Sequence, residues 1–117
     1  MISKLANISS DAQIGKNVRI DSFTTIYENV IIGDDSIIHP NVTIYPGARI
    51  GKGVEIYPGA VISAIPQDLK FDGEDTTVEI GDNTVIRECV TIHKGTSDKW
   101  KTSIGSNCLI MTYVHIA

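Results

Sequence analysis

Residues 20–50 read IDSFTT-IYENVI-IGDDSI-IHPNVT-IYPGAR-I, with an isoleucine at every sixth position. Of the 20 isoleucines in the chain, 17 share this phase, and they are Ile2, Ile8, Ile14, Ile20, Ile26, Ile32, Ile38, Ile44, Ile50, Ile56, Ile62, Ile80, Ile86, Ile92, Ile104, Ile110 and Ile116. A period of six does not fit the 3.6-residue repeat of an α-helix. It indicates short strands joined by tight corners, and therefore an all-β chain.

A small or β-branched residue follows most of these isoleucines four positions later, as Val18, Thr24, Val30 and Ser36 illustrate. Both residues of each hexad are expected to point inward, so that three successive hexads close one triangular coil. The pattern resembles the known class of hexapeptide β-helices. That resemblance implies a left-handed parallel β-helix of about five to six coils, formed by residues 1–117 as a single domain.

Two insertions interrupt the regular coils. Ile-Gly pairs begin at residues 14, 32 and 50, spaced by 18, and return at 80 and 104. The later spacings exceed 18 by 12 and by 6, which places one insertion near Ser63–Val78 and the other near Gly95–Lys101. Asp68, Glu74 and Asp98 break the isoleucine series there. Because loops that leave a rigid scaffold often carry function, these insertions are the candidate functional segments.

Composition excludes several other classes of protein. The net charge of −4, from 10 basic and 14 acidic side chains, argues against nucleic-acid binding. No apolar run reaches the roughly 20 residues that span a bilayer, and the first residues do not form a signal peptide. Cys89 and Cys108 do not make a disulfide framework. We therefore expect a cytoplasmic protein in a reducing compartment, with no membrane insertion.

Five segments resemble one enzyme family specifically. They are the first insertion with QDLK at 67–70, VEIGD at 78–82, IRE at 86–88, VTIHKGT at 90–96 and HIA at 115–117. The chain resembles the acyl-[acyl-carrier-protein]–UDP-N-acetylglucosamine O-acyltransferases, which catalyse the first step of lipid A synthesis. The resemblance implies transfer of a (3-hydroxy)acyl group from acyl carrier protein to the 3-hydroxyl of UDP-N-acetylglucosamine. It also implies a homotrimer with sites between adjacent β-helices, and no cofactor or metal.

The same resemblance implies the site residues. Gln67, Asp68 and Lys70 match the substrate-contacting loop of the family, and their side chains suit sugar hydroxyls and an anionic nucleotide. His93 and His115 match histidines that line its cleft. The catalytic histidine would be residue 118, beyond Ala117, and later coils and a helical domain would follow. We therefore expect residues 1–117 to be the N-terminal portion of the enzyme, without transfer activity, since a general base typically contributes about 10²–10⁴-fold.

The column count predicts what surrounds the histidines. His93 and Lys94 are predicted to lie on the outer surface of the coil. His39 is predicted to face outward, with Tyr57 one coil above it and Asp21 one coil below it, in a simple surface contact.

Three alternatives share the fold. A γ-type carbonic anhydrase needs three zinc-binding histidines, and the count of columns separates His39 from His93 and His115. A non-catalytic, ice-binding solenoid needs a flat rank of paired threonines, whereas here one broken column, of Thr25, Thr43 and Thr91, has no paired column beside it. A sister acyltransferase with another acceptor is the third, and the loop from Gln67 to Lys70 argues against it by resemblance.

Overall fold

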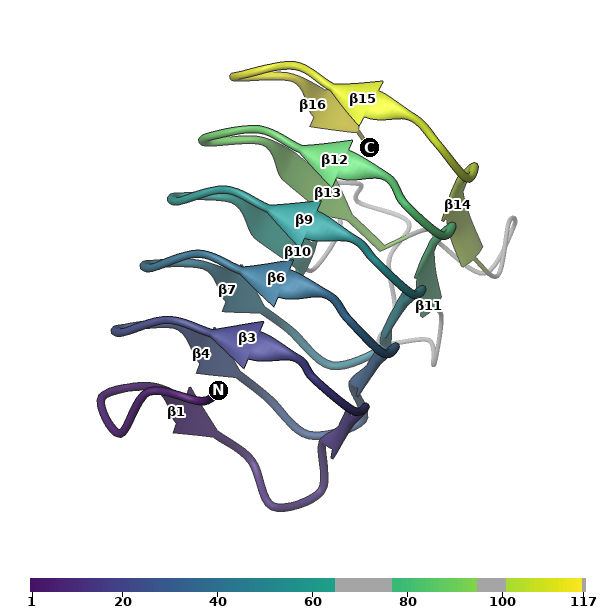
Figure 1. Ribbon diagram of the computed structural model, residues 1–117. Coiled ribbons are helices and arrows are strands. Elements are labelled where there is room, and N and C mark those ends of the chain that lie inside the picture. Colours follow the sequence, from purple (N-terminus) through teal and green to yellow (C-terminus); the bar gives the residue numbers. More distant parts are fainter. Residues whose placement is uncertain (65–76, 95–100, 117) are drawn as a thin grey trace.

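A computed structural model describes residues 1–64, 77–94 and 101–116. Within these ranges the chain forms sixteen short strands, and each turn of the solenoid stacks on the one before it (Figure 1). The amino and carboxyl ends lie at opposite ends of the stack. The architecture is a left-handed parallel β-helix, as the resemblance to the hexapeptide class implied. The described residues contain no helix of the length and apolar character needed to cross a bilayer.

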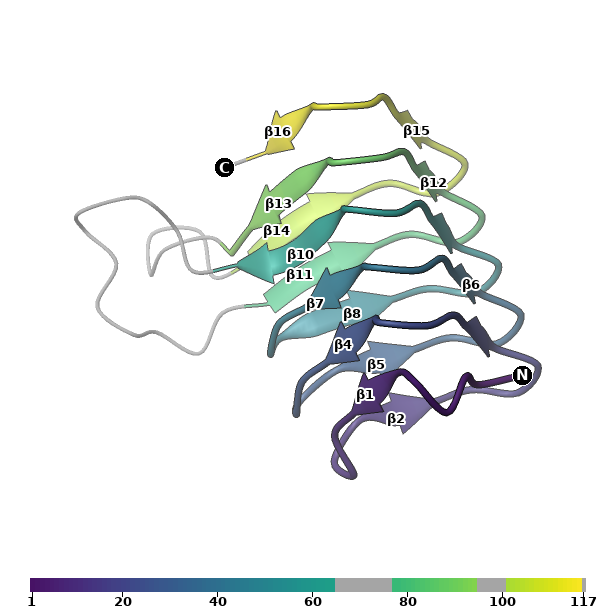
Figure 2. The same ribbon diagram turned by 90° about the vertical axis from the view of Figure 1, so that its left-hand side faces the viewer.

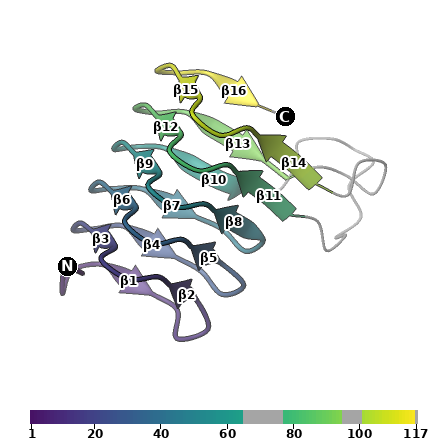
Figure 3. The ribbon, with the colours of Figure 1, turned by 45° about the vertical axis from the view of Figure 1, so that its right-hand side comes forward.

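Successive strands go to three different sheets, so each coil contributes one strand to each face (Figures 2 and 3). The first sheet contains, in order, β1 (Asn7–Ile8), β4 (Thr25–Ile26), β7 (Thr43–Ile44), β10 (Val61–Ala64), β13 (Thr91–His93) and β16 (His115–Ile116). The second contains β2 (Gln13–Ile14), β5 (Ile31–Ile32), β8 (Ala48–Ile50), β11 (Thr77–Ile80) and β14 (Lys101–Ile104). The third contains β3 (Arg19–Ile20), β6 (Ile37–Ile38), β9 (Glu55–Ile56), β12 (Val85–Ile86) and β15 (Leu109–Ile110).

The register of the sheets confirms the positions of both insertions. Ile44 pairs with Ile62 across one regular coil of three hexads. Ile62 then pairs with Ile92, and Ile92 pairs with Ile116, so each of these two coils is longer than the regular one. The additional residues therefore lie between β10 and β11 in the first case and between β13 and β14 in the second. Residues 65–76 and 95–100, with Asp68, Glu74 and Asp98, lie outside the described residues.

The isoleucine ladder forms the core. Neighbours in strand β5 show how strictly the phase decides burial, because Ile32 is 1% exposed and Ile31 is 38% exposed. The small residues of the second column, such as Val30 and Val42, are buried with the ladder. Each fully buried isoleucine stabilises the fold by roughly 2 kcal/mol, and every coil gains that stabilisation from the coils on either side.

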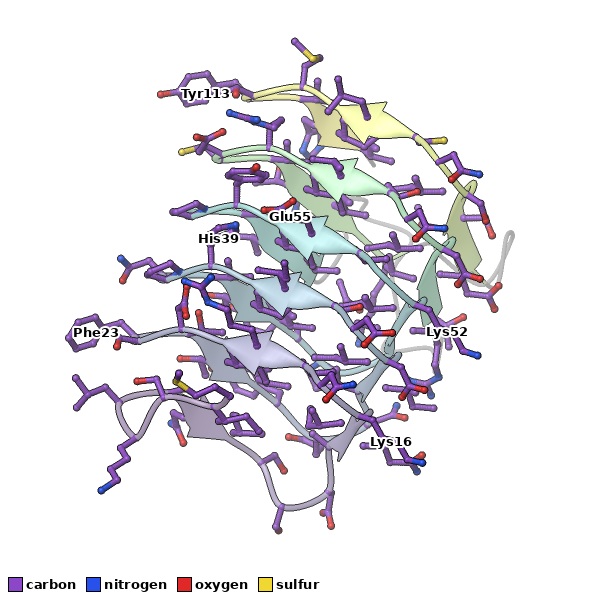
Figure 4. All side chains as sticks on the ribbon, viewed as in Figure 1. Lys16, Phe23, His39, Lys52, Glu55 and Tyr113 are labelled. Atoms are coloured by element: carbon purple, nitrogen blue, oxygen red, sulfur yellow. The ribbon has the colours of Figure 1, made fainter. Side chains whose placement is uncertain are left out.

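One corner of the solenoid carries aromatic residues in an unfavourable conformation. Between the third and first sheets, the equivalent residue of successive coils has a positive φ, and these residues are Phe23 (63°), Asn41 (61°), Gly59 (81°), Cys89 (60°) and Tyr113 (65°). Asn and Gly tolerate this left-handed region, whereas a bulky side chain is strained there. Phe23 and Tyr113 nevertheless project into solvent on the same side of the molecule, 64% and 78% exposed (Figure 4).

Replacing Phe23 with asparagine is expected to stabilise the protein. The substitution relieves left-handed strain by about 1 kcal/mol and removes a side chain that is mostly in water. The free energy of unfolding in urea measures the gain. Asn41→Phe, at the equivalent position of the next coil, is the matched control and is expected to lose a similar amount. A loss of stability in Phe23→Asn would show that the ring packs usefully despite its backbone strain.

Candidate functional site

The two described histidines of the predicted site lie side by side on the first sheet. His93 ends β13 and His115 begins β16, and Ile92 pairs with Ile116 between them. The two imidazole rings meet edge to face, with centroids 4.7 Å apart and an angle of 67° between their planes. The expectation that both histidines flank one isoleucine column is confirmed, and it places two titratable rings in direct contact.

The prediction that His93 lies on the outer surface is wrong. Its exposed fraction is only 8%. The pairing of β10 with β13 is irregular beside this residue, where Ile62 pairs with Ile92 but Ala64, two residues on, pairs with His93. The extra residue is Ser63, which has a φ of 67° and is buried. A bulge of this kind re-aims the side chains beside it, and a count in steps of six does not reveal it.

The side chain of His93 has an unused hydrogen-bonding atom. Its Nδ1 is buried, and no hydrogen-bond partner for it lies among the described residues. Burial lowers the pKa of His93, and the nearby charge of His115 lowers it further, while a hydrogen bond with the backbone of Ile116 partly opposes both. His93 is therefore neutral at neutral pH. Since a buried unsatisfied nitrogen needs an explanation, Nδ1 is a candidate acceptor for a hydroxyl or N–H group of a ligand.

The lowered pKa of His93 predicts a loss of stability in acid. The unfolded chain, with an ordinary histidine pKa of 6.5, binds a proton before the folded chain does. Stability therefore falls as the pH drops through that value towards the lower pKa of the folded state. Urea midpoints measured from about pH 7.5 to about pH 5 should fall less steeply for His93→Gln than for the unmodified chain. Parallel curves for the two proteins would contradict the prediction.

His115 is exposed but held from two sides. Its Nδ1 lies 2.7 Å from the hydroxyl Oγ1 of Thr91, the residue that pairs with it across the ladder. Its ring also contacts His93. Nearby, the hydroxyl of Thr102 donates a hydrogen bond of 3.0 Å to the carbonyl of His93, and the backbone N–H of Lys94 donates one of 2.8 Å to Ala64. These bonds connect the end of β13, where His93 lies, to strands β14 and β10.

The remaining predicted site residues, Gln67, Asp68 and Lys70, lie outside the described residues. Their roles as substrate ligands stay a prediction.

His39 belongs to a separate surface network. Its ring stacks on Tyr57, with centroids 4.5 Å apart, as the column count predicted. Its Nε2 lies 2.8 Å from a carboxylate oxygen of Glu55, toward which it points in Figure 4. Sequence reasoning missed Glu55, although the regular coil pairs it directly with Ile37, two residues before His39. Asp21, the other expected neighbour, instead accepts a hydrogen bond from Arg19 at 3.0 Å.

The described residues supply neither the zinc ligands that a carbonic anhydrase needs nor the threonine rank that an ice-binding protein needs. Within residues 1–64, 77–94 and 101–116, no group of three or more His, Cys, Asp or Glu side chains is arranged to hold a metal ion. The threonine column runs through Thr25, Thr43, Val61 and Thr91, so valine interrupts it. It therefore does not form the continuous threonine rank that an ice-binding surface requires.

A shallow hollow of about 300 Å³ lies over the second sheet, and sequence reasoning did not single it out. Ile31, Arg49, Glu79 and Ser103 line it. These residues come from successive coils, and each directly precedes an isoleucine of the ladder, which is the only sequence signal that groups them.

The chain is similar to known proteins both in sequence and in structure. A family profile described as bacterial transferase hexapeptide (six repeats) matches residues 11–46 and 31–64. The structure superposes on UDP-N-acetylglucosamine acyltransferase from Bacteroides fragilis with a TM-score of 0.99 and 56% identity, over 100% of this chain and 46% of that one. The Francisella novicida enzyme gives a TM-score of 0.96 and 42% identity, over 100% and 43%.

A sequence relative agrees with the structures. The acyl-[acyl-carrier-protein]–UDP-N-acetylglucosamine O-acyltransferase of Aquifex aeolicus is 57% identical over 58 residues, which are 49% of this chain and 22% of the relative. The chain thus spans less than half of the length of these relatives.

The repeat and the three parallel sheets together define a hexapeptide-repeat protein with a left-handed β-helix. Within that class, the chain is similar to the UDP-N-acetylglucosamine O-acyltransferases, over its whole length and less than half of theirs.

Proposed function

We propose that this chain provides part of the substrate-binding cleft of an acyl-[acyl-carrier-protein]–UDP-N-acetylglucosamine O-acyltransferase. The reaction moves a (3-hydroxy)acyl group from acyl carrier protein to the 3-hydroxyl of the sugar, as the first step of lipid A synthesis. The observation that carries the proposal is the agreement with the Bacteroides fragilis enzyme over the whole chain, at a TM-score of 0.99 and 56% identity. A homotrimer in the cytoplasm, with acyl carrier protein as the donor, is part of the same proposal.

The chemistry of the reaction suits the histidine pair. The sugar oxygen attacks the thioester carbon as a general base removes its proton, and the carbon–sulfur bond breaks to release the carrier thiol. His93, kept neutral by its burial, offers Nδ1 as an acceptor for a sugar hydroxyl or amide. His115 offers its second ring nitrogen, Nε2, because Nδ1 is engaged by Thr91. In this proposal both residues bind and orient the acceptor, together with Gln67, Asp68 and Lys70.

Binding of UDP-N-acetylglucosamine to the chain tests the proposal. We expect saturable binding in a calorimetric titration and shifts of the His93 and His115 ring resonances. His115→Ala should weaken binding by about tenfold, the range for a lost hydrogen bond in a partly desolvated site. His39→Ala is the matched control, since His39 lies in the separate network with Glu55 and Tyr57, and it should bind normally. Failure of the unmodified chain to bind the nucleotide sugar would contradict the proposal.

Transfer itself is expected to be absent from the polypeptide of residues 1–117. The resemblance assigns the general base to position 118, and such a base contributes about 10²–10⁴-fold to the rate. In this proposal His93 and His115 bind and orient the acceptor, and neither replaces that base. The assay follows acylation of UDP-N-acetylglucosamine by hydroxyacyl carrier protein. Turnover equal to that of the Bacteroides fragilis enzyme in parallel assays would contradict this expectation.

A further inference from the structure

The hydroxyl of Thr91 makes a short contact that the scaffold does not require. Thr91 Oγ1 and His115 Nδ1 are 2.7 Å apart, on strands β13 and β16, which pair Thr91 directly with His115. The backbone N–H of Thr91 separately donates to the carbonyl of Val114, at 3.1 Å. The strand pairing therefore does not depend on the hydroxyl.

The same column shows that the fold accepts a residue without this hydroxyl. Val61 pairs with Thr91 from the coil below, and it pairs in turn with Thr43 on its other side. Threonine and valine have the same shape and the same preference for strands. Valine at position 91 is therefore expected to leave the sheet and its stability almost unchanged, and any effect of the substitution can be assigned to the hydroxyl.

The hydroxyl has a specific effect on the His115 ring. An exposed histidine samples several rotamers, and fixing one of them costs side-chain entropy. Thr91 at Nδ1 and the edge-to-face contact with His93 restrict the ring from two directions. A hydroxyl can donate to the lone pair of a neutral imidazole, which places the ring proton on the other nitrogen, Nε2.

We propose that Thr91 is a positioning residue: its hydroxyl donates to Nδ1 of His115, fixes one rotamer and one tautomer, and presents Nε2–H as a hydrogen-bond donor to a carbonyl, hydroxyl or phosphate oxygen of the ligand. The identity of that ligand rests on the proposed function. The ring orientation stands independently of it, since it follows from the contacts of His115 with Thr91 and His93.

Two substitutions and one control test this role in the chain of residues 1–117. Nitrogen-15 spectra of the imidazoles report the tautomer of His115, and nuclear Overhauser effects between the His93 and His115 rings report its rotamer. The unmodified chain and Thr91→Ser, which keeps a hydroxyl, should show one rotamer with the proton on Nε2. Thr91→Val should show averaged rotamers and a mixture of tautomers. Thr43→Val, in the same column, should match the unmodified chain.

Ligand binding provides the second measurement. Thr91→Val should bind UDP-N-acetylglucosamine about 3- to 10-fold more weakly, the effect of one lost hydrogen bond, and Thr91→Ser should restore the affinity. An unchanged His115 ring in Thr91→Val overturns the positioning role, as does a disordered ring with unchanged affinity. If the unmodified chain does not bind the nucleotide sugar, the proposed function fails, and the spectra still decide whether Thr91 orients His115.

Discussion

Replacing Ile32 with alanine is expected to lower the free energy of unfolding by about 2–5 kcal/mol. Ile32 lies in the middle of the isoleucine ladder, pairing with Ile14 on one side and Ile50 on the other. Truncation removes buried methyl groups and leaves a cavity that two closely stacked coils cannot easily fill. Because folded domains are stable by only about 5–15 kcal/mol, a single rung is a large fraction of the total. Urea denaturation followed by circular dichroism measures the change.

Ile31→Ala is the control for this prediction. Ile31 precedes Ile32 in strand β5, has the same side chain, and faces solvent. We expect this substitution to cost less, about 1 kcal/mol, because the side chain stays 38% exposed in the folded protein and its loss leaves no closed cavity. Equal losses for the two variants would contradict the view that the six-residue phase, and not isoleucine content, stabilises the solenoid.

Replacing Gly33 with alanine is expected to cost about 3 kcal/mol, at the upper end of the usual overpacking penalty. A β-carbon at residue 33 would lie 2.6 Å from the carbonyl carbon of Gly51 and 2.7 Å from its oxygen. Those atoms belong to the backbone of the next coil, which cannot move without disturbing the ladder on either side. The penalty therefore comes from the distance between coils, and it should appear as a lower melting temperature and a lower urea midpoint.

Gly105→Ala provides the matched control, because Gly105 occupies the same corner column near the carboxyl end of the stack. Among the described residues, a β-carbon there would meet the Cys108 sulfur alone, at an ordinary 3.6 Å. Alanine also restricts the unfolded chain, so we expect no loss and a gain of about 0.4–1 kcal/mol. Equal losses of stability in the two variants would contradict this prediction. They would show that the corner needs glycine for its backbone conformation, and that close stacking of the coils is not the cause.

Much of the fold could be predicted from the isoleucine phase alone. A residue that returns every sixth position must face the same way on each strand, so Ile32 is buried and Ile31 is not. The two excess spacings placed both insertions between the correct strands, because parallel register forces each isoleucine to pair with the next member of its column. The pairing of His39 with Tyr57 and the contact of His93 with His115 follow from the same count.

The local geometry of the candidate site depended on the tertiary structure. His93 is buried beside the bulge at Ser63, where β10 and β13 pair irregularly next to the first insertion, and periodicity does not encode that irregularity. Likewise, the lowered pKa of His93 requires its burial and the proximity of His115, and the orientation of His115 requires the hydroxyl of Thr91. A repeat specifies which residues share a column. Burial, protonation and ring orientation depend on distances of a few ångströms between columns, and only the packed chain sets those distances.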